Sequence, residues 1–357
     1  MISERIRFVS TEFKARSEGK NGAGGSALIV VIWVIGLLSL LVSSFAFDAH
    51  LEARITSYYR SRIKAEYLAR SGIELAELLM FKSLNAKNVP EGDTQQSEWW
   101  YSHSKRLAQG LPIRGLEQPL GAGTIVLDIV PEPARRNVNL LKEDDWERLL
   151  DVGEIPQEMW GELMAAFLDW IDTDDTARFN GAETDDYYGK LDSPYKAKNA
   201  PLDTVGELLL VKGFTKAILS GGLIETNDVN QEAIRISGIE DILTTYGDGK
   251  VNVNAASQRV LMTLPNVDEI LAGAIIEERE GAADAQGKKE DTSYRDVNDM
   301  FARIPELDPA IRNYVSTDSG IFRITSVGSV HGIKRNLWCI VRYANKQMTI
   351  LQWREEE

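Results

Sequence analysis

Hydrophobic residues are spread unevenly along the chain, and one long apolar run lies near the N-terminus. It covers residues 26–47 and contains no charged side chain and no proline. At about 1.5 Å per residue a helix of this length spans about 33 Å, enough to cross a hydrocarbon core of about 30 Å. The run is also too long for the apolar part of a cleaved secretory signal, which is shorter and ends at a small-residue cleavage site. We therefore predict one transmembrane helix.

The helical pattern continues beyond the apolar run. Apolar residues recur there at the spacing of one helix face, with charged residues between them, at Leu51, Ile55, Tyr59, Ile63, Tyr67, Leu68, Leu75, Leu78 and Leu79. This spacing is typical of an amphipathic helix. We expect a single helix over residues 26–82, apolar in its first part and amphipathic in its second.

Strand-like patterns lie on either side of a long helical region. Alternating apolar residues predict strands at the start of residues 124–141 and in three later segments, 321–330, 335–343 and 348–353. Between them the apolar spacing is helical, over residues 144–155, 156–171, 203–213, 258–265, 269–280 and 297–304. A short helix is also expected near Trp99 to Leu107, inside a polar connector. The pattern predicts an α+β fold in which a helical domain interrupts a strand domain.

The charge distribution gives the membrane orientation and argues against one class of partner. Residues 1–25 carry five basic and three acidic side chains, a net charge of +2, and the whole chain carries −14. Basic flanks stay on the cytoplasmic side, so residues after the run are expected across the membrane. A strongly acidic surface repels phosphate backbones, so we expect no nucleic acid partner.

The residues that commonly carry catalysis are sparse. The chain has three histidines, none beside a serine or cysteine in a catalytic signature, and a single cysteine, Cys339, which excludes an internal disulfide. We predict that the protein is not an enzyme. A membrane-anchored hydrolase stays open as an alternative, and it requires convergent carboxylates with raised pKa values.

An unusual density of carboxylates marks residues 169–186. Seven acidic side chains lie there with one arginine, Arg178. Numbered from Asp172, an EF-hand-like loop places Asp172, Asp174 and Glu183 at its first, third and twelfth positions. A hard cation such as Ca²⁺ would relieve the repulsion between these charges.

The acidic segment departs from a true EF-hand at two positions. Its sixth position is Ala177 in place of glycine, and its fifth is Thr176 in place of a better oxygen donor. Calcium binding in another geometry stays possible, and so does an acidic, solvated loop without metal.

The N-terminus resembles the type IV prepilin class. Gly25, preceded by a basic leader and followed by an uncharged apolar stretch, matches the site at which that class is cleaved, so the resemblance implies a mature chain that begins at Ser26. The fifth residue of mature pilins is usually glutamate, whereas here it is Val30. This departure resembles the K-type minor pseudopilins of type II secretion systems, which that family places at the pilus tip.

Two internal segments are similar to the same family, residues 168–188 and 249–265. The resemblance covers nearly the whole chain and implies a pilin-like α+β unit with a large all-helical insert. It also implies calcium in the acidic loop, for which we select Asp172, Asp174 and Glu183, with Asp185 and Asp186 for a second ion.

Residues 251–280 resemble a helix-hairpin-helix, a module known for gripping DNA. A membrane-anchored DNA receptor is therefore the alternative function. However, the turn at residues 265–268 has neither glycine nor lysine, and Glu269, Glu277 and Glu278 follow it. We expect its apolar residues to pack in the insert, and residues 201–214 to form a second hairpin of this kind.

Together these inferences predict a minor pseudopilin that initiates or caps a periplasmic pseudopilus for protein export. We expect it in the inner membrane with one span and its bulk in the periplasm, bound to other minor pseudopilins and to the major pseudopilin, and processed by prepilin peptidase. The expected parts are the leader 1–25, the helix 26–82 that spans the membrane over 26–47, the first pilin-like part 83–139, the helical insert 140–317 and the C-terminal strands 318–357.

Overall fold

The computed structural model describes residues 24–86, 89, 94, 98–224, 233–281 and 292–356. The chain divides into two compact units, one that ends at Arg60 and one that begins at Ser61. The first 23 residues of the expected leader lie outside the described residues. Gly25 and Ser26 belong to the first turn of helix α1, Gly24–Ala86.

The described part of the first unit is helix α1 up to Arg60, which holds the apolar run of residues 26–47. Every side chain from Ala27 to Arg60 is exposed. Proline is absent from this part, and its large apolar side chains point outward all round, so the helix has no soluble core of its own. By length and composition it can cross a membrane, which agrees with the predicted span.

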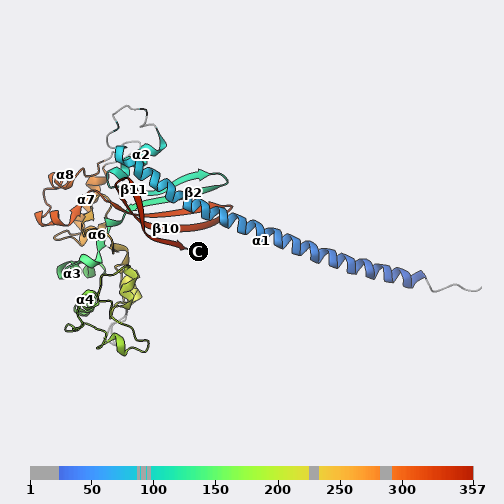
Figure 1. The fold of residues 1–357 in the computed structure, drawn as a ribbon, viewed down its shortest axis with the longest axis horizontal. Coiled ribbons are helices and arrows are strands. Elements are labelled where there is room, and N and C mark those ends of the chain that lie inside the picture. The colour runs from blue at the N-terminus through green and yellow to red at the C-terminus, as the bar shows by residue number, and fades with distance from the viewer. Residues whose placement is uncertain are drawn as a thin grey trace, which may run out of the picture. The chain divides into compact units, whose positions relative to one another are not determined.

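The second unit is built on an antiparallel five-stranded sheet in the order β1-β2-β9-β10-β11 (Figure 1). Its strands are Ile113–Leu120, Gly123–Pro131, Ile321–Val330, Ile333–Ala344 and Gln347–Glu356. The predicted strands are all present. The sequence analysis did not find β1, because a register shift at Gly115 and a proline at 119 interrupt its alternation.

The last part of α1, from Ser61 to Ala86, packs on one face of this sheet. Its buried side chains share a core with inward residues of β2, β9 and β10. The contact is close, because a Cβ added at Gly328 of β9 would lie 1.9 Å from the carbonyl oxygen of Ala65. Glycine at this position therefore lets the helix and the sheet approach each other.

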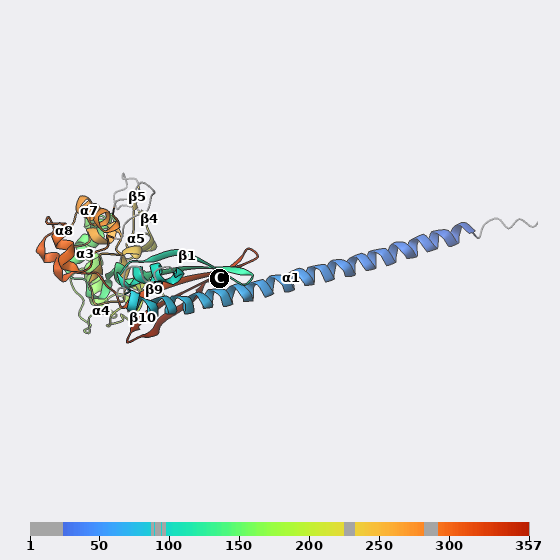
Figure 2. The ribbon, with the colours of Figure 1, turned by 90° about the horizontal axis from the view of Figure 1, so that it is seen from above.

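An insert of residues 132–320 separates β2 from β9. Figures 1 and 2 show its helices gathered beyond one end of the sheet. The helices are α3 Glu143–Val152, α4 Gln157–Ile171, α5 Lys216–Ser220, α6 Gln258–Met262, α7 Glu269–Glu280 and α8 Val297–Arg303. The connector before β1 holds α2, Trp99–Ala108, as expected.

The insert has its own hydrophobic core, in which the rings of Trp146 and Phe167 lie 4.7 Å apart. The prediction of an all-helical insert is wrong. Three two-stranded sheets also lie within it, β3-β6, β4-β5 and β7-β8. Their strands are Arg136–Asn137, Leu243–Thr244, Gly222–Ile224, Ile234–Ile236, Val251–Asn252 and Val315–Ser316. Segments this short show no periodicity, and most of them pair with distant residues.

A buried ion-pair network marks the junction of insert and sheet. Glu132 follows β2 directly and is 0% exposed. Both of its carboxylate oxygens accept hydrogen bonds from Arg323 of β9 at 2.9 Å, and Arg135 and Thr244 add further bonds of 3.0 and 2.7 Å. The network joins the first residues of the insert to the sheet.

Candidate functional site

The acidic loop predicted from the sequence begins at the end of α4. Helix α4 is amphipathic and places Asp169 in the insert, where this residue is 0% exposed. The Asp169 carboxylate accepts hydrogen bonds from the backbone N–H groups of Arg178 at 3.1 Å and Ala182 at 2.9 Å. A Cβ at Gly181 would lie 1.9 Å from Asp169 Oδ2, so glycine is required there. The loop backbone is thus held around the Asp169 carboxylate by hydrogen bonds.

Arg178 links two carboxylates at the start of the loop. Its Nη1 donates to Asp169 Oδ1 at 2.7 Å and also to Asp172 Oδ2. Hydrogen bonds to Asp172 and Asp169 raise the pKa of the Arg178 guanidinium, so it stays charged.

Four buried acceptor oxygens in the same region have no hydrogen-bond donor among the described residues. They are Asp172 Oδ1, both carboxylate oxygens of Glu183 and Asn199 Oδ1. The amide of Asn199 is oriented by its Nδ2, which donates to the carbonyl oxygen of Asp174 at 3.2 Å and to Asp175 Oδ1 at 3.0 Å. Buried polar atoms are normally paired, so unpaired acceptors indicate a missing donor or cation.

Glu183 is the most unusual of these groups, since its side chain is ionisable and the residue is only 1% exposed. Burial raises the pKa of its carboxyl, and the charges of Asp169, Asp172 and Asp175 raise it further. The nearby backbone N–H of Thr184 lowers the pKa in part, but it does not form a hydrogen bond with either oxygen of Glu183. A carboxylate in this position is stabilised by a nearby positive charge.

The five predicted ligand residues differ in burial: two of them have buried carboxylate oxygens and three are exposed. Asp172 and Glu183 each present a buried oxygen without a donor. Asp174 is exposed, and its Oδ1 accepts the backbone N–H of Thr176 at 2.9 Å. Asp185 and Asp186 are exposed in a turn. Within the described ranges, no three His, Cys, Asp or Glu side chains gather into a metal centre.

A site for Ca²⁺ here has to include more than carboxylates. Calcium accepts amide and carbonyl oxygens together with carboxylates. Two carboxylates and the Asn199 amide supply four such oxygens, all buried. The donor set therefore suits a hard cation.

The sequence analysis missed Asn199 because it lies sixteen residues beyond Glu183 in a polar segment without a motif. Its backbone N–H bonds to the carbonyl oxygen of Trp170 at 2.9 Å, and this tertiary contact brings it to the loop. Arg178 was visible as the one arginine among the carboxylates, but its two partners were not.

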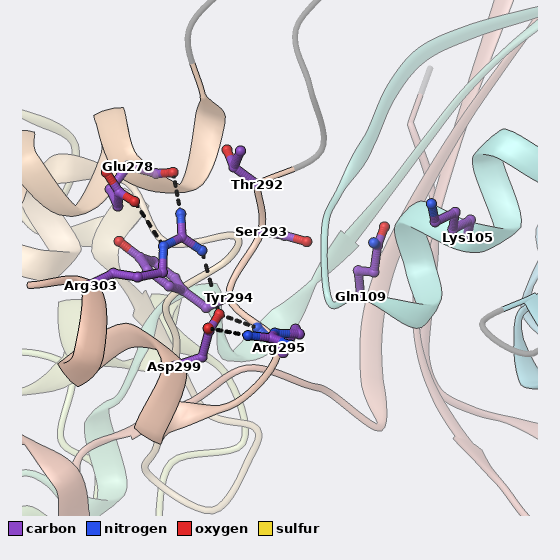
Figure 3. Close-up of a pocket in the computed structure, with 9 residues that line it drawn as sticks. All are labelled: Lys105, Gln109, Glu278, Thr292, Ser293, Tyr294, Arg295, Asp299 and Arg303. Atoms are coloured by element: carbon purple, nitrogen blue, oxygen red, sulfur yellow. Dashed lines mark hydrogen bonds and ion pairs between the residues drawn. The ribbon is translucent and has the colours of Figure 1, made fainter.

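A second polar site is a cavity of about 710 Å³ between α2, α7 and α8 (Figure 3). Arg303 lines one side of it, where it donates to Glu278 Oε1 at 2.8 Å and stacks on Tyr294 at 4.7 Å. Hydrogen bonds from Arg295 lower the pKa of Asp299. Among the described residues that line the cavity, Asp299 therefore has a pKa shifted in the direction opposite to the one that the hydrolase alternative requires.

The hairpin between α6 and α7 is packed into the insert. Leu261, Val267 and Ile275 are buried in the insert core, whereas Ile270, which was expected to pack there, is 83% exposed. Asp268 caps α7 by accepting the backbone N–H of Leu271 at 2.8 Å. A phosphate would have to compete with this carboxylate for the helix N-terminus.

Known proteins resemble this chain in sequence and in fold. A family model described as type II secretion system, protein K, matches residues 128–221. A putative type II secretion system protein K of Escherichia coli K12 is 27% identical over 214 residues, 56% of this chain and 60% of that protein. Protein K of Klebsiella pneumoniae is 26% identical over 208 residues, 54% of this chain and 59% of that protein.

The chain thus spans about 60% of the length of these curated relatives. Among solved structures, the GspK-GspI-GspJ complex of the type 2 secretion system from enterotoxigenic Escherichia coli contains a chain of similar fold, with a TM-score of 0.54 and 16% identity. The match covers 86% of this chain and 99% of that one. The resemblance predicted from the sequence is confirmed, and the chain is similar to type II secretion system protein K in sequence and in fold.

Proposed function

We propose that the protein is a structural minor pseudopilin of a type II secretion system. The observation that carries this proposal is the combination of three parts in one chain. A helix able to cross a membrane is followed along the chain by an antiparallel sheet, and a large insert separates two strands of that sheet, β2 and β9. The similar fold of the chain in the GspK-GspI-GspJ complex supports it.

The apolar part of α1 anchors the protein in the inner membrane, and the second unit lies in the periplasm. The +2 charge of residues 1–25 supports this orientation, since basic flanks remain cytoplasmic. Prepilin peptidase cleaves after Gly25 and leaves Ser26 as the first residue.

The protein assembles with other minor pseudopilins and with the major pseudopilin, and it occupies the pilus tip. The similar fold of a chain in the GspK-GspI-GspJ complex supports minor pseudopilin partners. Val30 supports the tip position, because a buried glutamate that pairs with the subunit above has no use where no subunit follows. The insert of residues 132–320 blocks further addition and caps the pseudopilus.

The mass of the mature N-terminus tests this proposal. The protein is recovered from membranes of cells with and without prepilin peptidase. A chain that begins at Ser26 only when the peptidase is present supports the pseudopilin function. A chain that keeps its leader, or is cut after Ala46, contradicts it.

The tip position has a test of its own. The Val30→Glu variant should disturb initiation of assembly, and gold labelling should place the native protein at one end of the pseudopilus. Normal secretion by the variant, together with native protein along the shaft, would exclude the tip.

The acidic loop binds Ca²⁺ through Glu183, Asp172 and Asn199. Four buried oxygens without donors support this ligand set. The exposed Asp174, Asp185 and Asp186 contribute to the field that attracts the ion, and they are weaker candidates for direct contact. The bound cation supplies the positive charge that the buried Glu183 lacks, and so it stabilises the fold of the insert.

A further inference from the structure

We propose that Arg178 is a built-in cation of the acidic loop, and that it limits the loop to one bound Ca²⁺. The number of carboxylates in the loop would accommodate two. This inference rests on the calcium binding proposed above, and it concerns the number of ions.

The first step is the use that the loop makes of Asp169. This residue is fully buried, and both of its oxygens already accept hydrogen bonds. The donors are the Nη1 of Arg178 at 2.7 Å and the backbone N–H groups of Arg178 and Ala182. A carboxylate with these partners is neutralised inside the protein and is closed to a metal ion.

The second step is that Arg178 bonds to only one of the two carboxylate oxygens of Asp172. Oδ2 of Asp172 accepts from Arg178, whereas Oδ1 is buried and has no donor among the described residues. One oxygen of this carboxylate therefore belongs to the arginine, and the other is one of the four buried oxygens that have no donor among the described residues, with those of Glu183 and Asn199. These four are the oxygens that the proposed calcium binding uses.

The third step is that Arg178 is fixed in place. Its backbone N–H and its Nη1 both bond to Asp169, and Gly181 lies against the same carboxylate. The residue is therefore tethered at its main chain and at the end of its side chain. A guanidinium held in this way occupies the position that a second cation would take between Asp169 and Asp172.

Removal of the guanidinium exposes this position to a metal. Without Arg178, the carboxylates of Asp169 and Asp172 face each other with no cation between them. Two like charges at this range repel, and a hard cation relieves the repulsion. The Arg178→Gln variant is thus expected to gain a calcium site.

The experiment counts bound ions by native mass spectrometry and by isothermal titration with CaCl₂ alone. The full chain is used in detergent after treatment with chelator. The wild type is expected to bind one Ca²⁺ per chain, and Arg178→Gln two. If Arg178→Gln does not fold in chelator, the count is made on protein prepared in calcium and then dialysed, and two ions are expected again.

Two further variants separate charge from general damage. Arg178→Lys keeps a positive charge in place and should restore the count of one. Lys212→Gln removes a different cation near the loop, whose Nζ lies 3.4 Å from the carbonyl oxygens of Asn180 and Gly181, and should also leave one ion.

The outcomes distinguish this inference from the calcium proposal. A wild type that binds no calcium overturns the calcium proposal itself. A wild type that binds two ions, or an Arg178→Gln variant that binds one, overturns the role of Arg178 while calcium binding stands.

Discussion

Two glutamates, Glu132 at the junction of insert and sheet and Glu183 in the acidic loop, are both buried, but only Glu132 is paired with arginines. Glu132 is 0% exposed and Glu183 is 1% exposed. At the junction, burial raises the pKa of Glu132, but hydrogen bonds and charge from Arg323, with Arg135 and Thr244, outweigh it and hold the pKa below its usual value. In the loop, the pKa of Glu183 is raised by burial and by neighbouring carboxylates.

The difference teaches which part of the fold is complete by itself. A buried charge is tolerated when it is paired and hydrogen-bonded, and costs stability when it is not. The chain supplies the partners of Glu132. Among the described residues it supplies no hydrogen-bond donor for Glu183, so if calcium binds as proposed, the junction should be independent of calcium and the loop should depend on it.

The largest expected effect is at the junction. Glu132→Gln leaves Arg323 and Arg135 without their counter-charge, and should lower the free energy of unfolding by about 3 kcal/mol, the low end for a broken buried pair because both arginines are partly exposed. Denaturant unfolding with and without calcium measures it. The exposed Glu117→Gln is the matched control, and a loss that calcium rescues would contradict the comparison.

The next effect is the calcium dependence of the loop. At a free concentration about 100 times its dissociation constant, calcium should stabilise the wild type by about 2.7 kcal/mol. Thermal unfolding in CaCl₂ and in chelator measures this difference. Glu183→Gln should lose most of it, whereas Asp186→Asn, on an exposed carboxylate of the same loop, should retain it.

A smaller effect distinguishes the two glutamates by the pH dependence of the free energy of unfolding, measured in chelator. Glu183→Gln should be more stable than the wild type at pH 7 by about 1 kcal/mol, because it removes an unpaired buried charge. This gap should close as the pH falls through the raised pKa of Glu183, above 4.5, since protonation relieves the same cost.

The stabilisation from Glu132 should behave in the opposite way. Its folded pKa is lowered, so its contribution is present above 4.5 and is lost as the pH falls through the lowered value. Unfolding measured from pH 7 to about pH 3 follows both trends. A gap for Glu183→Gln that widens on acidification would show that its carboxylate is stabilised without calcium.

The smallest effect is expected at Phe179, which is 91% exposed and lies between Arg178 and Gly181 in the acidic loop. Phe179→Ala should change the free energy of unfolding by less than about 0.5 kcal/mol, because little apolar surface is buried there. The same unfolding experiment measures it, and Asp169→Asn is the contrast that should disturb the loop. A loss near that of Asp169→Asn would mean that the ring holds the loop.

The sequence predicted the parts of the fold that repeat a pattern. The uncharged run and the spacing of residues 51–79 predicted α1, and alternation predicted β2, β9, β10 and β11. It did not predict β1 or the short strands of the insert, because pairs such as Val251 with Val315 are fixed by tertiary contact. A strand of two residues has no period to detect.

The candidate site was predictable in composition and less so in geometry. Charge density alone pointed to residues 169–186, and loop numbering selected Asp172, Asp174 and Glu183, of which Asp174 is exposed. Distances and burial could not be obtained in this way. Asp169 serves as an internal anchor, and Asn199 enters through a backbone hydrogen bond to Trp170.

The most direct test of the calcium account is anomalous diffraction from crystals of the protein grown with CaCl₂. We predict an anomalous peak at about 2.3–2.6 Å from oxygens of Glu183, Asp172 and Asn199, with Asp169 bound only to Arg178 and to backbone amides. Absence of a peak at saturating calcium, or an ion held by Asp185 and Asp186 while Glu183 stays unpaired, would contradict it.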